Sequence, residues 1–97
     1  MLFAVRFYDK PERLDVRKKS LNAHIEWLRA HHDVILVGGS LRPDPESDAT
    51  GALWIVECDS KCNIEELLRT DPFWIHGLRE RYEIYSWHKA FPEKSAI

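Results

Sequence analysis

The residues of this chain most suited to chemistry are a histidine and an aspartate about half the chain apart. His24 falls in a helical stretch, and Asp71 opens the tripeptide Asp71-Pro72-Phe73. An imidazole titrates near neutral pH, and a carboxylate fixes its tautomer and stabilises its cation, so the pair suits proton transfer. Each residue also has a structural interpretation, as a His bonded to a backbone carbonyl and as an Asp-Pro helix cap. We expect both side chains to meet in one cleft.

Other candidates lie at strand ends. Gly38-Gly39-Ser40 follows an apolar run, where it is either a strand-terminating turn or a place where missing side chains let a ligand approach the backbone. The Ser40 hydroxyl would then point into that space. The segment has no phosphate-loop pattern. Arg6 interrupts an apolar strand, so it is either a solvated edge residue or an anion-binding group that faces the cleft.

Metal binding is not predicted. His31 and His32 are neighbours that point about 100° apart on a helix, and no carboxylate stands three or four residues later to complete a set of ligands. Cys58 and Cys62 have no Cys or His at zinc-site spacing. We interpret both cysteines as ordinary thiols.

The elements that must position these residues follow from periodicity and turn signals. Strands are predicted at 2–8, 34–37, 52–56 and 82–87, and a long helix at 12–32. A second helix is capped by Asp59 or Ser60, and a short helical turn over 73–76 ends at Gly77. The apolar stripe of the long helix should pack on the sheet, with His24 at its edge in a row with other residues. The stripe is Leu14, Leu21, Ile25, Leu28 and His32, and the row is Arg17, Ser20, Trp27 and His31.

The order β-α-β-β-α-β is that of an α+β, ferredoxin-like sandwich, with a four-stranded antiparallel sheet and helices on one face. The runs 34–37 and 52–56 are apolar on both sides. A strand with one face in water should alternate, so something must cover the second face of the sheet. A second copy of the same sheet is the economical answer, and a homodimer is predicted.

Size and charge exclude several classes of protein. The 97 residues, 44% of them hydrophobic, fit one domain over 1–97 with a core over about 1–88 and a short C-terminal tail. The net charge of -2 and the interleaved charges argue against a nucleic-acid partner. No apolar run approaches the roughly 20 residues that span a bilayer. A soluble, cytoplasmic protein with no membrane partner is expected.

From Met1 to about Trp87 the chain resembles the YCII-related (YciI-like) family of the dimeric α/β-barrel superfamily. The resemblance is carried by Phe7 with the following Asp9-Lys10-Pro11, by His24, and by several later residues. These are Gly39, Leu41, Asp71-Pro72-Phe73 and Gly77-Leu78. It implies a ferredoxin-like homodimer with a site on His24 and Asp71. Gly39-Ser40-Leu41 departs from the Gly-Pro-Leu common in relatives, which puts a hydroxyl near the cleft.

The resemblance also implies one enzymatic precedent, the cofactor-independent dehydrochlorination of a chlorinated hydroxyhydroquinone. In that interpretation His24 acts as base or proton shuttle, Asp71 orients it or takes part directly, and Ser40 hydrogen-bonds a ring oxygen. Arg6 stabilises the phenolate, and Gly39 and Phe73 complete the substrate-binding set. The alternatives are an isomerase of the muconolactone type and a dimer that binds a small ligand without turnover.

Overall fold

Alternating apolar residues build a sheet that carries all the helices on one side. The computed structural model describes residues 1–91 and 97. The elements, in chain order, are β1 (Leu2–Asp9), α1 (Leu14–Ala30), β2 (Ile35–Leu41), β3 (Gly51–Glu57), α2 (Lys61–Leu68), α3 (Pro72–Ile75) and β4 (Arg79–Ser86). The strands lie in the order β2-β3-β1-β4, and each neighbouring pair is antiparallel. The predicted ferredoxin-like fold is confirmed.

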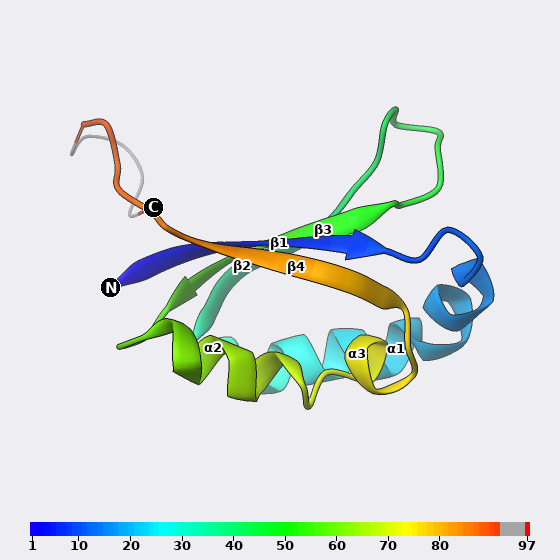
Figure 1. Ribbon diagram of the computed structural model, residues 1–97, viewed down its shortest axis with the longest axis horizontal. Helices are drawn as coiled ribbons and strands as arrows, with labels where there is room; N and C mark the ends of the chain where they lie inside the picture. Colours follow the sequence, from blue (N-terminus) through cyan, green and yellow to red (C-terminus); the bar gives the residue numbers. More distant parts are fainter. Residues whose placement is uncertain (92–96) are drawn as a thin grey trace.

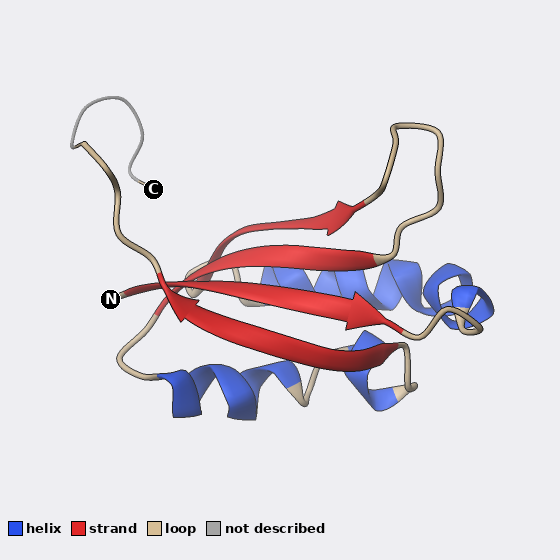
Figure 2. Cartoon of the chain, turned by 45° about the horizontal axis from the view of Figure 1, so that its top comes forward, coloured by secondary structure: helices blue, strands red, loops and turns tan. Residues whose placement is uncertain are grey.

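The two faces of the sheet have different surroundings (Figure 1). We call the face that packs on the helices the covered face, and the other the open face. Along β1, Phe3, Val5 and Phe7 point to the covered face and are buried, as the period of two predicts. Figure 2 shows α1, α2 and α3 together on that side. Among the described residues, no helix lies over the open face.

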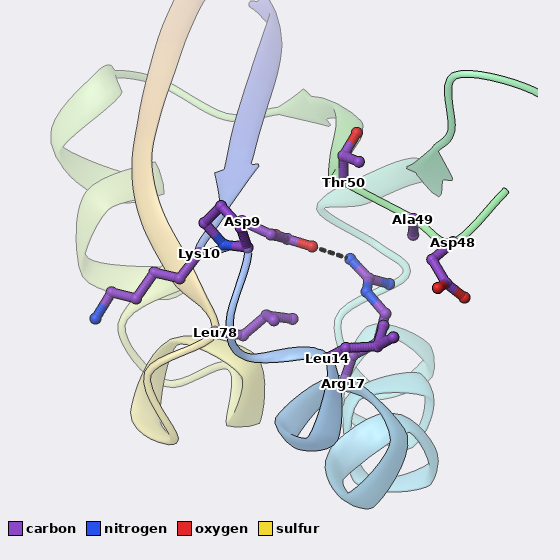
Figure 3. Close-up of a pocket in the computed structure, with 9 residues that line it drawn as sticks. Asp9, Lys10, Leu14, Arg17, Asp48, Ala49, Thr50 and Leu78 are labelled. Carbon is purple, nitrogen blue, oxygen red and sulfur yellow. Dashed lines mark hydrogen bonds and ion pairs between the residues drawn. The ribbon is translucent and has the colours of Figure 1, made fainter.

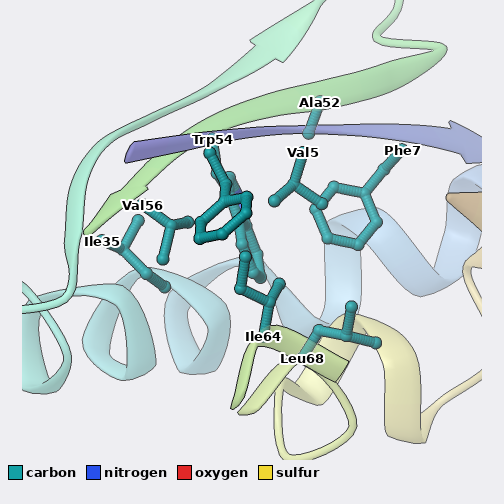
Figure 4. Packing of buried hydrophobic residues seen from close by; sticks show 9 residues of the cluster. Val5, Phe7, Ile35, Ala52, Trp54, Val56, Ile64 and Leu68 are labelled. Atoms are coloured by element: carbon teal, nitrogen blue, oxygen red, sulfur yellow. The ribbon is translucent and has the colours of Figure 1, made fainter. Parts of the chain in front are cut away.

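The core fills the layer between the covered face and the helices (Figure 4). Trp54 of β3 stands at its centre, with its ring 4.5 Å from that of Phe7. Ile64 and Leu68 of α2 close the layer from below. Side chains of this size each stabilise a fold by roughly 1.5–3 kcal/mol when fully buried. The core therefore fixes the distance between sheet and helices that the cleft described below requires.

The helix ends follow the sequence signals. Ser60 caps α2 and accepts a hydrogen bond from the backbone N–H of Asn63. Asp71 caps α3, with Pro72 in its first turn, as predicted. Gly77 has a φ of +79°, and Leu78 N–H donates to the Phe73 carbonyl across it, so the chain turns there into β4.

Several details differ from the sequence interpretation, and one is that β4 begins at Arg79 instead of at the predicted residue 82. Strand β2 continues through Gly38, Gly39 and Ser40 to Leu41, so these residues pair with β3 instead of ending the strand. A Cβ at Gly38 would lie 3.3 Å from Cδ1 of Trp54, which shows that the glycine leaves room for the indole ring.

The rotation of α1 also differs from the prediction. The predicted stripe is buried only in part: Leu28 packs against the core, but Leu21 is 40% exposed, and the buried residue of α1 is His24. The row that contains Arg17, His24 and Trp27 faces the body of the protein instead. Polar side chains can take this inward position because each of them finds a partner there, as described below.

No helix in the described ranges is both long and apolar enough to cross a membrane. Cys58 and Cys62 are free thiols, as predicted. Burial raises the pKa of the half-buried Cys58, whose thiol donates to the Ser60 carbonyl.

Candidate functional site

His24 and Asp71 meet in the layer beneath the sheet. His24 Nδ1 lies 2.7 Å from Asp71 Oδ1, and the two residues are 7% and 1% exposed. The same oxygen accepts a hydrogen bond of 3.1 Å from the Phe73 backbone N–H, so the helix cap and the dyad share one carboxylate. An ionised carboxylate only accepts hydrogen bonds, so the proton of the neutral imidazole resides on Nδ1. The Nε2 lone pair is then free to take a proton.

Aromatic side chains hold the imidazole ring in place. The Phe73 ring stacks on that of His24 with centroids 4.0 Å apart and planes at 14°. Trp27 lies one turn along α1, at 6.5 Å and 16°, and donates from Nε1 to Thr70 Oγ1. These contacts leave the ring little freedom to rotate, and an oriented base is what proton transfer needs.

The dyad opens on a cleft of about 150 Å³ between α1 and strands β2 and β3. Its walls include His24, Gly39 and Ser40, which the sequence analysis had proposed as site residues. Ser40 is exposed, and it pairs with Ala52 on the covered face. A Cβ at Gly39 would have no heavy atom within 4 Å, so there is open space beside the backbone there.

Two residues expected to bind the substrate do not line the cleft. Arg6 occupies the open face, because it alternates with Val5 and Phe7, and its guanidinium lies 4.4 Å from the Tyr8 ring centroid. The expectation that Arg6 faces the His24 cleft is therefore wrong. Phe73 is 0% exposed, so it lies behind the imidazole as a support and offers no surface to a ligand in this chain.

The sequence analysis missed a buried charge cluster beside the dyad. Asp9, at the end of β1, binds Arg17 of α1 at 2.5 Å and Arg79 of β4 at 2.7 Å. Arg17 and Arg79 both line the same cleft as His24. Burial lowers the pKa of Arg79, and the nearby Asp9 and Asp71 oppose that shift. No single segment signals this cluster, because the position of Arg79 depends on how β4 pairs with Asp9 of β1.

A second cavity, of about 220 Å³, adjoins the first (Figure 3). It lies between the start of α1 and the connection from β2 to β3, with Leu14, Ala49 and Leu78 among its walls. The Asp9–Arg17 ion pair lies between the two cavities, since Arg17 lines both. Across the described ranges, no three His, Cys, Asp or Glu side chains are grouped to hold a metal ion.

The fold and the dyad together define a ferredoxin-like protein with a histidine–aspartate pair in a cleft beneath its sheet. The chain matches the model of the YCII-related domain over residues 1–88, and it belongs to that family. A search of curated proteins found no match to it.

Solved structures resemble the chain to different degrees. It is 29% identical to 5-chloro-2-hydroxyhydroquinone dehydrochlorinase (TftG) from Burkholderia phenoliruptrix AC1100, in complex with 2,5-dihydroxybenzoquinone. The TM-score is 0.82, over 91% of this chain and 94% of that one. A candidate antibiotic biosynthesis monooxygenase from Bacteriodes thetaiotaomicron VPI-5482 is 17% identical with a TM-score of 0.58, over 100% of this chain and 95% of that one. Protein Atu4242 from Agrobacterium tumefaciens is 20% identical with a TM-score of 0.52, over 95% and 98%. The last two share the fold alone.

Proposed function

We propose that the protein is a cofactor-independent acid/base lyase that acts on a small hydroxylated aromatic ring, with dehydrochlorination of a chlorohydroxyhydroquinone as its reaction. The observation that carries the proposal is the buried His24–Asp71 pair, 2.7 Å apart, at the wall of a cleft. The similarity to a dehydrochlorinase supports the choice of reaction. The proposed role in the degradation of aromatic compounds rests on the same similarity.

The dyad supplies the two proton movements that this reaction needs. His24 Nε2 takes a phenolic proton and delivers it to the ring carbon that carries chlorine, which gives a keto tautomer. A second phenolic oxygen then loses its proton as the C–Cl electron pair leaves with chloride. The products are a hydroxybenzoquinone, chloride and one proton, so no oxidant is required. Asp71 keeps Nδ1 protonated and stabilises the imidazolium, and Ser40 donates a hydrogen bond to a ring oxygen.

A panel of candidate substrates tests the proposal. Purified protein is mixed, without oxygen because hydroquinones oxidise in air, with a chlorohydroxyhydroquinone, and chloride and quinone absorbance are followed together. One chloride per quinone, formed only with protein present, is expected. Muconolactone is the comparison substrate, since its isomerisation uses the same proton transfers with no leaving group. Isomerisation without chloride release would replace the lyase with an isomerase, and binding with no turnover of either compound would make the protein a binder.

We also propose that the protein acts as a homodimer that joins the open faces of two sheets. On the open face, Val37, Leu53 and Tyr85 are 48%, 40% and 55% exposed, which is unusual for large side chains on a sheet. Sedimentation at micromolar concentration should give about twice the chain mass of 11.4 kDa. A folded monomer at that concentration would contradict the proposal.

A further inference from the structure

The cleft holds more hydrogen-bond donors than the chain can satisfy. Nε and Nη2 of Arg79, Nε of Arg17 and Nε1 of Trp54 are buried without a partner within the part of the chain that the structure describes. Arg79 is 5% exposed and Trp54 is 1% exposed, and both line the cleft with His24. A buried donor without a partner destabilises the fold, because it has lost its hydrogen bonds to water. Several such donors around one space indicate a ligand that accepts hydrogen bonds.

A local irregularity of β4 brings Arg79 into the cleft. Tyr8 pairs with Arg81, but Asp9 pairs with Arg79, so β4 has one extra residue at this point. By simple alternation Arg79 would lie on the open face with Arg81 and Glu83. The bulge turns it to the covered face, where its guanidinium packs 4.6 Å from the Phe7 ring centroid and 5.1 Å from that of Phe73. Bulges often re-aim a side chain beside a functional site.

Positive charge is in excess around the cleft. Arg17 and Arg79 share a single carboxylate, that of Asp9. Asp71 is occupied by His24 and by the helix cap. Arg42 adds a third guanidinium at the rim, where Nη1 donates to the Ser47 carbonyl. A cation in a water-poor site attracts an anion more strongly than it would in bulk water.

We propose that the cleft binds its ligand as a planar oxyanion, and that Arg79 and the indole N–H of Trp54 donate hydrogen bonds to its charged oxygen. This inference rests on the proposed function and deepens it, because it assigns the substrate class as an ionised phenol or hydroxyquinone. The guanidinium fork matches two oxygens on neighbouring ring carbons. Arg79 stabilises the phenolate that forms when His24 Nε2 takes the phenolic proton, and His24 then delivers that same proton to the ring carbon that carries chlorine.

Equilibrium binding without turnover tests this inference. The probe is 2,5-dihydroxybenzoquinone, whose acidic hydroxyls are ionised at neutral pH, and the comparison is its neutral dimethyl ether. Wild-type protein should bind the anion at least about 10-fold more tightly than the ether, which corresponds to one charge-assisted hydrogen bond. Equal affinity for the two compounds would overturn the proposal.

Three variants separate the donors from general effects of charge. Arg79→Gln should weaken binding of the anion about 10- to 100-fold and leave the ether unchanged. Trp54→Phe keeps an aromatic core residue and should cost about 3- to 10-fold, which provides a test if Arg79→Gln fails to fold. Arg29→Gln removes the same charge from an exposed part of α1 and should change nothing. Unchanged binding of the anion by Arg79→Gln, or by Trp54→Phe if only that variant folds, would contradict the proposed donor set.

The outcome separates this inference from the lyase proposal. Selective binding of the anion that depends on Arg79, with no chloride released from any substrate, would support the oxyanion site and contradict the proposed lyase activity. Turnover of a chlorohydroxyhydroquinone, together with equal affinity for the anion and the ether, would contradict the oxyanion site and support the proposed lyase activity.

Discussion

The covered and open faces of the sheet both carry arginines packed against aromatic rings, but in the described part of the chain only the covered face is enclosed by helices. On the covered face, Arg79 is buried between aromatic rings and shares Asp9 with Arg17. On the open face, Arg6 and Arg81 lie over the Tyr8 ring, with Arg81 3.6 Å from its centroid. The helices of this chain cover the first face, and no helix within residues 1–91 covers the second (Figure 1). We infer that the covered face is built for chemistry and the open face for association.

Among variants that test the roles of the two faces, we expect the largest effect on turnover from substitution of Asp71. Asp71→Asn should reduce turnover about 100-fold or more, because the amide keeps an oxygen for the cap but cannot stabilise the His24 cation. Its unfolding free energy in urea should stay near the wild-type value. Asp71→Ala should lose the same activity and a further ~1 kcal/mol of stability, since the cap is lost too. Full activity of Asp71→Asn would make the carboxylate purely structural.

Two leucines that are equally exposed test the division of labour between the faces. Leu53 on the open face and Leu21 at the cleft are each 40% exposed. Leu53→Asp should weaken the dimer about 100-fold or more, because it places an unpaired charge in the proposed interface. Sedimentation over a range of concentrations measures the shift. An unchanged dimer would show that the open face is not the interface.

The matched change on the other side is smaller in its expected effect. Leu21→Asp adds a negative charge to the cleft and should weaken binding of 2,5-dihydroxybenzoquinone about 10-fold through repulsion. The dimer should form as in the wild type. Tighter binding of the anion by this variant would contradict the excess of positive charge that we assign to the cleft.

The smallest effect concerns acid stability on the open face. A hydrogen bond from the Tyr8 hydroxyl, 2.7 Å long, lowers the pKa of Glu83. A lowered pKa gives stability that is present above the ordinary carboxyl value, about 4.3, and is lost as pH falls through the lowered value. The difference in urea midpoint between wild type and Glu83→Gln should therefore be constant from pH 5 to 7 and shrink toward pH 3. A difference that grows on acidification would contradict the assigned direction.

Periodicity predicted most of the fold. The alternation in 2–8 assigned Phe3, Val5 and Phe7 to one face. The same alternation places Arg6 on the opposite face, since adjacent residues of a strand point to opposite sides. The rotation of α1 was not predictable from apolar residues alone. His24 can be buried there because it forms a hydrogen bond with Asp71, which lies 47 positions away in the sequence.

Arg79 was missed for a different physical reason. Its orientation depends on a one-residue bulge in β4, and a bulge follows from pairing with Asp9, which a single strand does not reveal. The continuation of β2 through Gly38 and Gly39 was missed likewise, because glycine usually weakens a strand and the pairing with β3 overrides that preference. Single segments predicted where the strands and helices lie, whereas the positions of Arg79, Gly38 and Gly39 depend on how two strands pair.

The central claim, that the covered cleft works through His24, is tested most directly by anaerobic chloride release from a chlorohydroxyhydroquinone by His24→Ala. We expect the rate to fall about 100-fold or more, the usual effect of removing a positioned base. His32→Ala, which removes an exposed imidazole near the end of the same helix, should keep the wild-type rate. Chloride release by His24→Ala at the wild-type rate would contradict the account.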